Sequence, residues 1–212
     1  FVVLLGKGEH QITSSWTSQY GSEYLTTLDI TCSNITFVGQ GIDTTTILGG
    51  FVIHNFENIT FKNMTVTNTS QYADGIEMSN AKVELFDVAL KGCSSCALNV
   101  VGDNSETILV ATRCEFANNS TWGANVKGSL TSATFKNCVF NDNEYDGIHV
   151  RDSKIHLHGE ATAIHSNGED GIWAAQSSKV ILHLPSHHNT SYNNKDRDRI
   201  AFSGATITNV ED

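Results

Sequence analysis

The sequence predicts an all-β solenoid, and three observations carry that prediction. Short apolar segments recur about every 24 residues along the chain. Within these segments apolar and polar residues alternate, as in β-strands that bury one face. Threonine, serine, asparagine and glycine are frequent while lysine, arginine and glutamate are sparse, and this composition disfavours helices. With one proline and no linker-like stretch, residues 1–212 are expected to form a single domain.

The first predicted strand of each repeat follows a turn that reads Asp-Gly-Ile at three places, residues 74–76, 146–148 and 170–172. Equivalent strands begin at steps of 22, 26, 24 and 24 residues, at Gly75, Ala97, Gly123, Gly147 and Gly171. Because alternate side chains of a strand point to opposite faces, Ile148 and Val150 are expected to point into the core. The recurrence indicates that the Asp-Gly turn belongs to the scaffold.

Two further strands complete each repeat. One set carries the apolar pairs Met64/Val66, Val88/Leu90, Cys114/Phe116, Cys138/Phe140 and Thr162/Ile164. The other carries Ile35/Phe37, Ile59/Phe61, Val83/Leu85, Leu109/Ala111, Ala133/Phe135, Ile155/Leu157 and Val180/Leu182. Coils stacked at about 4.8 Å pair each strand with its equivalents above and below. The result is a parallel β-helix of about seven to eight coils, and its long repeat favours the right-handed form.

The two ends of the solenoid differ in character. Residues 183–212 are polar and charged, and we expect them to form an irregular C-terminal cap. The chain opens inside an apolar run, residues 1–5, which fits a longer N-terminal region that has been removed. This apolar strand is expected to pair end to end with another copy of the chain or with other subunits.

Charge and sequons restrict the setting. The formal net charge of -10 and the absence of a basic patch argue against nucleic-acid binding, and no apolar run approaches the roughly 20 residues that span a membrane. Asn-x-Ser/Thr sequons predict N-glycosylation and an extracellular or cell-surface location. The predicted glycosylation sites are Asn34, Asn58, Asn63, Asn68, Asn118, Asn119 and Asn189.

Two stretches carry a family resemblance: NITFVGQGIDTTTILGG (34–50) and NITFKNMTVTNTSQYADGI (58–76). They resemble the opening coils of right-handed β-helix proteins of the pectin-lyase-like superfamily. The resemblance implies that fold, in a superfamily that holds polysaccharide lyases, hydrolases, esterases and epimerases as well as spikes, adhesins and structural proteins. The motifs of the best-known enzymes are missing from this chain. We therefore expect a secreted structural or surface-assembly protein, fibre formation included.

The outward side chains of the first strand set form the best candidate groove. A lyase or epimerase that acts on uronates needs a base and a cation, and His149 would be the base while Arg151 or Lys127 neutralises the substrate carboxylate. A glycan-binding module is a third reading, with Trp173 stacked on a sugar ring. The remaining ligand-binding candidates in this column are Glu77, Asn99 and Asn125. The alternative is that all of these are solvated positions on an exposed sheet.

Three side-chain clusters leave alternatives open. Asp146 and Asp170 lie one coil apart and either bind calcium or accept backbone N–H bonds in the turn. His158 and His183 are expected to be neighbours on adjacent coils, where they either bind a metal or lie on a polar surface. Cys114 and Cys138 share an inward column, as a disulfide or as free core thiols. The CxxC pair at residues 93–96 lacks the second pair that a zinc site needs.

Overall fold

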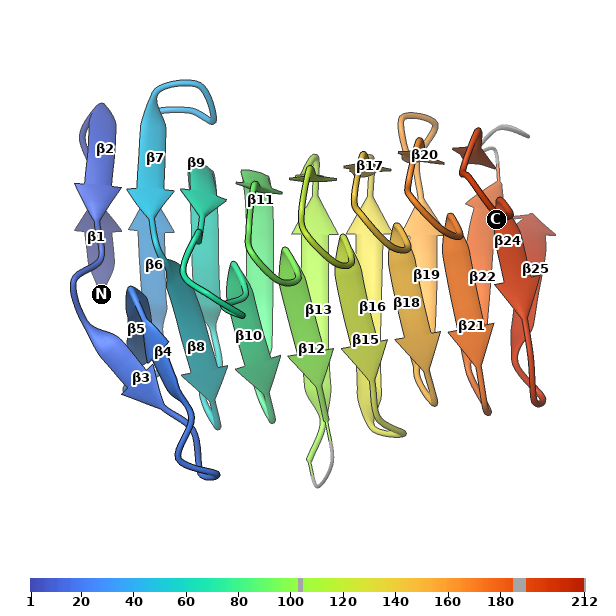
Figure 1. The fold of residues 1–212 in the computed structure, drawn as a ribbon, viewed down its shortest axis with the longest axis horizontal. Coiled ribbons are helices and arrows are strands. Elements are labelled where there is room, and N and C mark those ends of the chain that lie inside the picture. The colour runs from blue at the N-terminus through green and yellow to red at the C-terminus, as the bar shows by residue number, and fades with distance from the viewer. Residues whose placement is uncertain (103–104, 185–189, 212) are drawn as a thin grey trace.

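The chain forms a rod of stacked β-coils (Figure 1). The computed structural model describes residues 1–102, 105–184 and 190–211. Within these ranges the secondary structure consists of 25 strands, and there is no helix. Consequently no helix of the described residues is long and apolar enough to cross a membrane. The predicted all-β solenoid is confirmed.

Each coil contributes to three faces that run along the rod. Face one is an eight-stranded parallel sheet. In spatial order its strands are β5 (Thr27–Ile30), β8 (Gly50–His54), β10 (Ile76–Ser79), β12 (Leu98–Val101), β15 (Ala124–Lys127), β18 (Ile148–Arg151), β21 (Ile172–Ala175) and β24 (Arg199–Ala201).

Faces two and three are joined by two long strands, β9 (Ile59–Thr67) and β11 (Lys82–Lys91), which bend around the corner between them. Face two also holds β1 (Val2–Leu4), β6 (Ile35–Val38), β13 (Thr107–Thr112), β16 (Thr131–Lys136), β19 (Lys154–His158), β22 (Lys179–Leu184) and β25 (Thr206–Glu211). Face three also holds β2 (Gly8–Gln11), β7 (Thr45–Leu48), β14 (Glu115–Ala117), β17 (Val139–Asn141), β20 (Ala163–His165) and β23 (Ser191–Tyr192).

The register between coils is the one that the sequence repeat predicts. On face one Ile76 pairs with Leu98, Leu98 with Ala124, and Ala124 with Ile148. The inward side chains of these strands are fully buried. Aromatic rings continue the stacking inside the core, where Phe116 lies on Phe140 with a centroid distance of 4.6 Å and an interplanar angle of 11°. Like residues therefore lie over like residues along the rod.

The corner between faces two and three is a single residue with a left-handed backbone. Asn63, Asp87, Arg113 and Asn137 occupy this corner in successive coils, with φ of 56°, 52°, 53° and 53°. Asparagine and aspartate tolerate this conformation better than other non-glycine residues, because their short polar side chains bond locally to the backbone. The corner explains part of the chain's high asparagine content.

A column of buried asparagines runs along the corner between faces three and one. The side-chain N–H groups donate across successive coils, from Asn119 to Asn143 at 2.8 Å, from Asn143 to Asn167 at 2.9 Å and from Asn167 to Asn194 at 2.8 Å. Each acceptor oxygen also receives a backbone N–H from the coil before it. Asparagines in this column thereby satisfy buried backbone groups that the turn leaves without a strand partner.

Cys93 occupies one position of this asparagine column. Its backbone N–H donates to the side-chain oxygen of Asn119 at 3.0 Å, as the backbone of Asn119 does to Asn143. Its carbonyl accepts from Ser120, as the carbonyl of Asn119 accepts from Glu144. The thiol at this position supplies neither the amide donor nor the strong acceptor that the other coils use.

The two ends of the rod depart from the prediction in different ways. The segment 183–212 was expected to be an irregular cap, but its described part forms one more coil, in which β23, β24 and β25 pair with β20, β21 and β22. The polar segment forms strands because its backbone pairs with the strands of the preceding coil. At the other end β3 (Ser15–Thr17) and β4 (Glu23–Leu25) form an antiparallel hairpin that the repeat does not predict.

Two substitutions in the asparagine column are expected to change stability in opposite directions. Asn143→Ala lowers the free energy of unfolding by roughly 2–4 kcal/mol, because buried donors of Asn119 lose their acceptor. Cys93→Asn raises the free energy of unfolding by about 1 kcal/mol, because the two side chains are similar in volume. The new amide extends the ladder, which is the series of side-chain hydrogen bonds along the asparagine column. Thermal and denaturant unfolding followed by circular dichroism measures both.

The matched control is Asn209→Ala, at an exposed asparagine of the last coil, which is expected to leave stability almost unchanged. Equal effects of Asn143→Ala and Asn209→Ala would contradict the ladder.

Candidate functional site

The predicted groove residues form one outward column on face one. Glu77 pairs with Asn99, Asn99 with Asn125, Asn125 with His149, and His149 with Trp173. All five side chains are half-buried, while their inward neighbours on the same strands are buried. The alternation of each strand thus places these five side chains on the surface of one sheet, as the sequence predicts.

His149 lies between two tryptophans. Its ring is parallel to that of Trp173, with a centroid distance of 4.1 Å and an interplanar angle of 6°. On its other side Trp122, from the turn before β15, lies at 4.8 Å and is tilted by 37°. Phe202 lies 5.9 Å from Trp173 on the next coil. One ring face of Trp173 is therefore already covered, and a sugar could stack only on the side towards Phe202.

A buried carboxylate orients His149. Asp146 lies in the turn before β18. Its carboxylate is 2.9 Å from His149 Nδ1, and its side chain is only 3% exposed. Because a carboxylate accepts, Nδ1 carries the hydrogen, and Nε2 is left as the acceptor of the ring. An imidazole fixed in this tautomer has the arrangement of a general base. The sequence places Asp146 in the turn, and the repeat gives no signal of its contact with His149.

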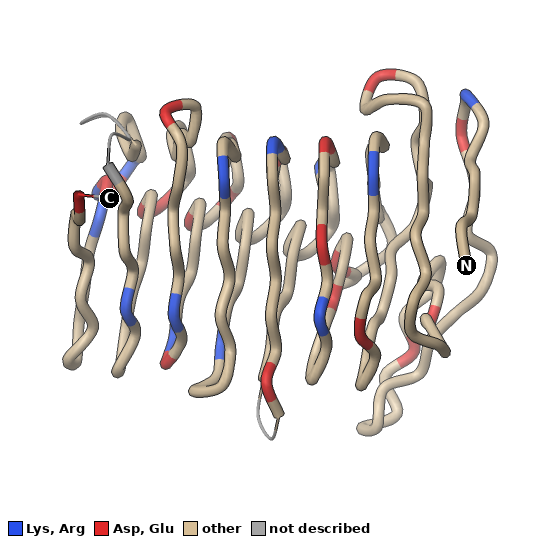
Figure 2. Tube along the Cα trace, turned by 180° about the vertical axis from the view of Figure 1, so that it is seen from behind, with Lys and Arg blue, Asp and Glu red and all other residues tan. Residues whose placement is uncertain are grey.

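Arg151 and Lys127 are direct neighbours in the adjacent outward column. The guanidinium carbon of Arg151 lies 5.7 Å from the Trp173 ring, and in the described part of the chain its buried Nε has no hydrogen-bond partner. Lys127 is exposed. Figure 2 shows that basic residues are spread over several coils. Lys127 on β15 and Arg151 on β18 form the cationic side of the groove.

The other end of the column is held by amide and carboxylate contacts. Asn125 donates to Asn99 at 3.0 Å, and Asn99 donates to Asp74 at 2.9 Å. Burial above all raises the pKa of Asp74, and the charge of Glu77 adds to this, whereas hydrogen bonds from Ser95, Asn99 and the Cys96 backbone act in the opposite direction. The polar groups predicted to bind a ligand are thus already paired along the rod.

Asp146 and Asp170 do not form a calcium site in this structure. One oxygen of Asp146 accepts the backbone N–H of Asp170, and the other faces His149. Both oxygens of Asp170 face the guanidinium of Arg197, at 2.9 and 3.1 Å. N–H donors and the charge of Arg197 therefore already compensate both carboxylates. Asp146 accepts a backbone N–H in the turn, which is the second of the two predicted roles.

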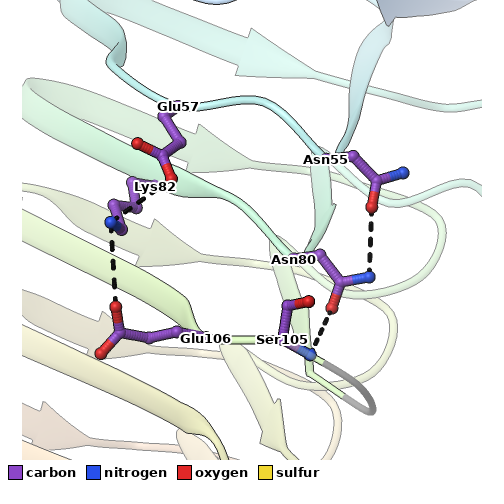
Figure 3. Close-up of a pocket in the computed structure, with 6 residues that line it drawn as sticks. All are labelled: Asn55, Glu57, Asn80, Lys82, Ser105 and Glu106. Carbon is purple, nitrogen blue, oxygen red and sulfur yellow. Dashed lines mark hydrogen bonds and ion pairs between the residues drawn. The ribbon is translucent and has the colours of Figure 1, made fainter.

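A shallow polar depression lies at the corner between faces one and two (Figure 3). Lys82 bridges Glu57 at 3.4 Å and Glu106 at 3.8 Å. Beside it Asn80 donates to Asn55 at 3.3 Å and accepts from the backbone of Ser105 at 3.2 Å. These contacts link three neighbouring coils, and none of the residues that line the depression carries a sequence signal of function.

A histidine cluster lies on face two. The rings of His158 and His183 stack at 3.8 Å, so the predicted contact between adjacent coils is confirmed. His156 completes the cluster, with Nδ1 2.8 Å from Nε2 of His183. Burial, followed by the charges of Lys154, His183 and His158, lowers the pKa of His156. These three histidines are the one group with metal-binding geometry that the described residues contain.

The cysteines are free thiols, and four of the five are buried. Cys114 and Cys138 lie in the core without a disulfide, which decides the alternative that the sequence left open. Burial raises the pKa of Cys93 and of Cys96 to about 12. Because a thiol must ionise to attack a disulfide or to bind zinc, the CxxC pair has the character of core packing.

The structure corrects two of the predicted glycosylation sites. Asn68 is 0% exposed and donates to the carbonyl of Asp74, and Asn119 is 2% exposed within the asparagine ladder. A glycan on either amide is incompatible with these contacts. Asn34, Asn58 and Asn118 are exposed and Asn63 is half-buried, so the prediction stays for them. Asn189 lies outside the described residues.

The arrangement can be compared with known proteins. No curated protein matches the sequence. Among solved structures, ORF18 of Geobacillus virus E2 is 13% identical, with a TM-score of 0.31; the match covers 99% of this chain and 53% of that one. The chain thus spans about half the length of that protein.

A family model described as "Right handed beta helix region" matches residues 74–211. This range covers more than half of the chain and contains five consecutive strands of face one from β10 to β21, together with β24. It accounts for the handedness that the repeat length favours. The chain belongs to the right-handed β-helix family.

Proposed function

We propose that this chain is a structural β-helix unit of a secreted, N-glycosylated surface assembly, such as a fibre. The observation that carries the proposal is that the outward side chains of face one bond and stack with one another from coil to coil. Asn125, Asn99 and Asp74 form one such series, and Trp122, His149 and Trp173 form another. Side chains that bond or stack with the next coil strengthen the contact between coils. A binding groove, in contrast, presents unpaired donors and acceptors to its ligand.

The first strand supports an assembly role. β1 pairs with β6 along one edge, and Phe1, Val2 and Leu4 are 86%, 65% and 75% exposed. An exposed apolar sheet edge is a template to which a further strand can add. In the proposed assembly the rod continues past this edge through strands of a neighbouring subunit.

Leu4→Lys is expected to abolish association without unfolding the chain, because it places a charge on the exposed face of β1. Light scattering coupled to size exclusion, at several protein concentrations, measures the mass. Leu130→Lys is the matched control, since Leu130 is also exposed but lies on a turn between β15 and β16, and it is expected to associate like the unmodified chain. A chain that is monomeric at every concentration contradicts the assembly role.

The same material, secreted from eukaryotic cells, tests the glycosylation. Peptide mapping by mass spectrometry is expected to find glycans at Asn34, Asn58, Asn63 and Asn118 and none at Asn68 or Asn119. If no glycan is found at any of the exposed or half-buried sequons, the support for a secreted glycoprotein is removed.

The second candidate is a lyase or epimerase that acts on an acidic polysaccharide. The hydrogen bond from His149 to Asp146 favours it, because a base held by a buried carboxylate lies beside Arg151 and Lys127. The chain's own formal charge of -10 opposes an anionic substrate. A glycan-binding module that uses Trp173 without turnover is the related alternative.

A panel of polyuronates distinguishes these readings. Enzyme action predicts unsaturated or epimerised products. Their rate of formation is expected to fall by about 100-fold or more in His149→Ala and in Arg151→Ala, because the base and the neutralising charge both act in the transition state. His165→Asn, on face three, is the control. Glycan binding that Trp173→Ala abolishes, with no product, supports the module. The structural role predicts neither turnover nor binding.

A further inference from the structure

The histidine cluster of face two is not a consequence of the coil repeat. His156 pairs with Thr134 in the preceding coil and with Ile181 in the following one. His158 pairs with Lys136, and His183 pairs with Val210. The neighbouring coils thus build the same columns without imidazoles. Three histidines at one point of the rod therefore need an explanation other than the fold.

The three rings bring one possible ligand nitrogen each into the same small region of face two. One nitrogen from each of the three histidines lies within 4.8 Å of the other two. Bonds of about 2.05 Å from a tetrahedral ion to two imidazoles place their nitrogens about 3.3 Å apart. The 2.8 Å between Nδ1 of His156 and Nε2 of His183 is somewhat shorter, because one ring donates its hydrogen to the other. The three rings are nearly parallel, with interplanar angles of 12–26°, so binding requires them to turn about their side-chain torsions until the three lone pairs meet at one ion.

The strands hold these rings in place. His156 and His158 are alternate residues of β19 and point to the same side of face two, and His183 lies on the adjacent strand β22. Their half-buried side chains leave an ion accessible from solvent. A site on paired strands is more rigid than one on a loop, and rigidity favours one coordination geometry.

We propose that His156, His158 and His183 bind a divalent first-row transition metal ion, with zinc as the best match. Imidazole suits zinc, copper and nickel, whereas calcium and magnesium require oxygen ligands. Three protein ligands leave at least one coordination position for water or for a donor from another molecule. This site lies on face two, so it is independent of the proposed structural role and of the groove on face one.

Nearby lysines modulate the proposed site. Lys154 lies on the same strand and pairs with Lys179 on the next coil, so the ion is bound in the presence of positive charge. Removal of one such charge is expected to tighten binding by about twofold to fivefold, the usual size of an exposed charge interaction. The preceding coil has Ser132 in register with Lys154, which makes Lys154→Ser compatible with the strand.

Calorimetric titration of the tag-free, chelator-treated chain with zinc chloride tests the proposal. One ion per chain is expected. His156→Thr and His183→Val are each expected to weaken binding by about 100-fold or more, since each removes a direct ligand. Neighbouring coils carry these replacement residues at the paired positions. His165→Asn is the control, because Asn141 precedes it in the same column, and it is expected to bind zinc normally.

X-ray absorption of the zinc-loaded chain gives a readout that does not depend on a variant folding. Three imidazole ligands per zinc are expected, and fewer than two would overturn the proposal. Zinc affinity that is unchanged in both His156→Thr and His183→Val would also overturn it. Inorganic phosphate that binds without metal, and is lost in the same variants, would assign the cluster to an anion instead.

Discussion

In-register stacking of parallel coils is the constraint on which the rest of the structure depends. Each strand forms its hydrogen bonds with the coils on either side, so a residue always lies over the equivalent residue of the next coil. A buried polar side chain in such a column must be satisfied by its neighbours along the rod. Asn119, Asn143 and Asn167 meet this requirement, because an amide donates in one direction and accepts from the other.

The same constraint shapes the surface. Outward side chains are also held about one strand spacing apart, which brings His149 against Trp173 and Asn99 against Asn125. Contacts of this kind resemble an active site when one coil is considered alone, although they arise from the stacking. Residues that break a column therefore carry more information about function than residues that continue it. The histidines at 156, 158 and 183 are the clearest such break in the described chain.

Sequence periodicity predicts the parts of the fold that repeat. The strand starts from Gly75 to Gly171, the inward residues and the contact between His158 and His183 all follow from a step of about 24 residues. The buried asparagines at 119, 143 and 167 obey the same step, but Asn119 was interpreted from its local triplet as a sequon. The contact of Asp146 with His149 depends on side-chain rotamers across a turn, and the β3–β4 hairpin lies outside the repeat. Neither has a periodic signal.

Amide hydrogen exchange followed by NMR tests the stacking account most directly. The backbone N–H groups of Asn119, Asn143 and Asn167 lie in turns, and each donates to a side-chain oxygen of the next coil. If the ladder is part of the stacked core, these amides exchange as slowly as those of the buried strands, within about tenfold. Exchange at the rate of unprotected turn amides would contradict the account.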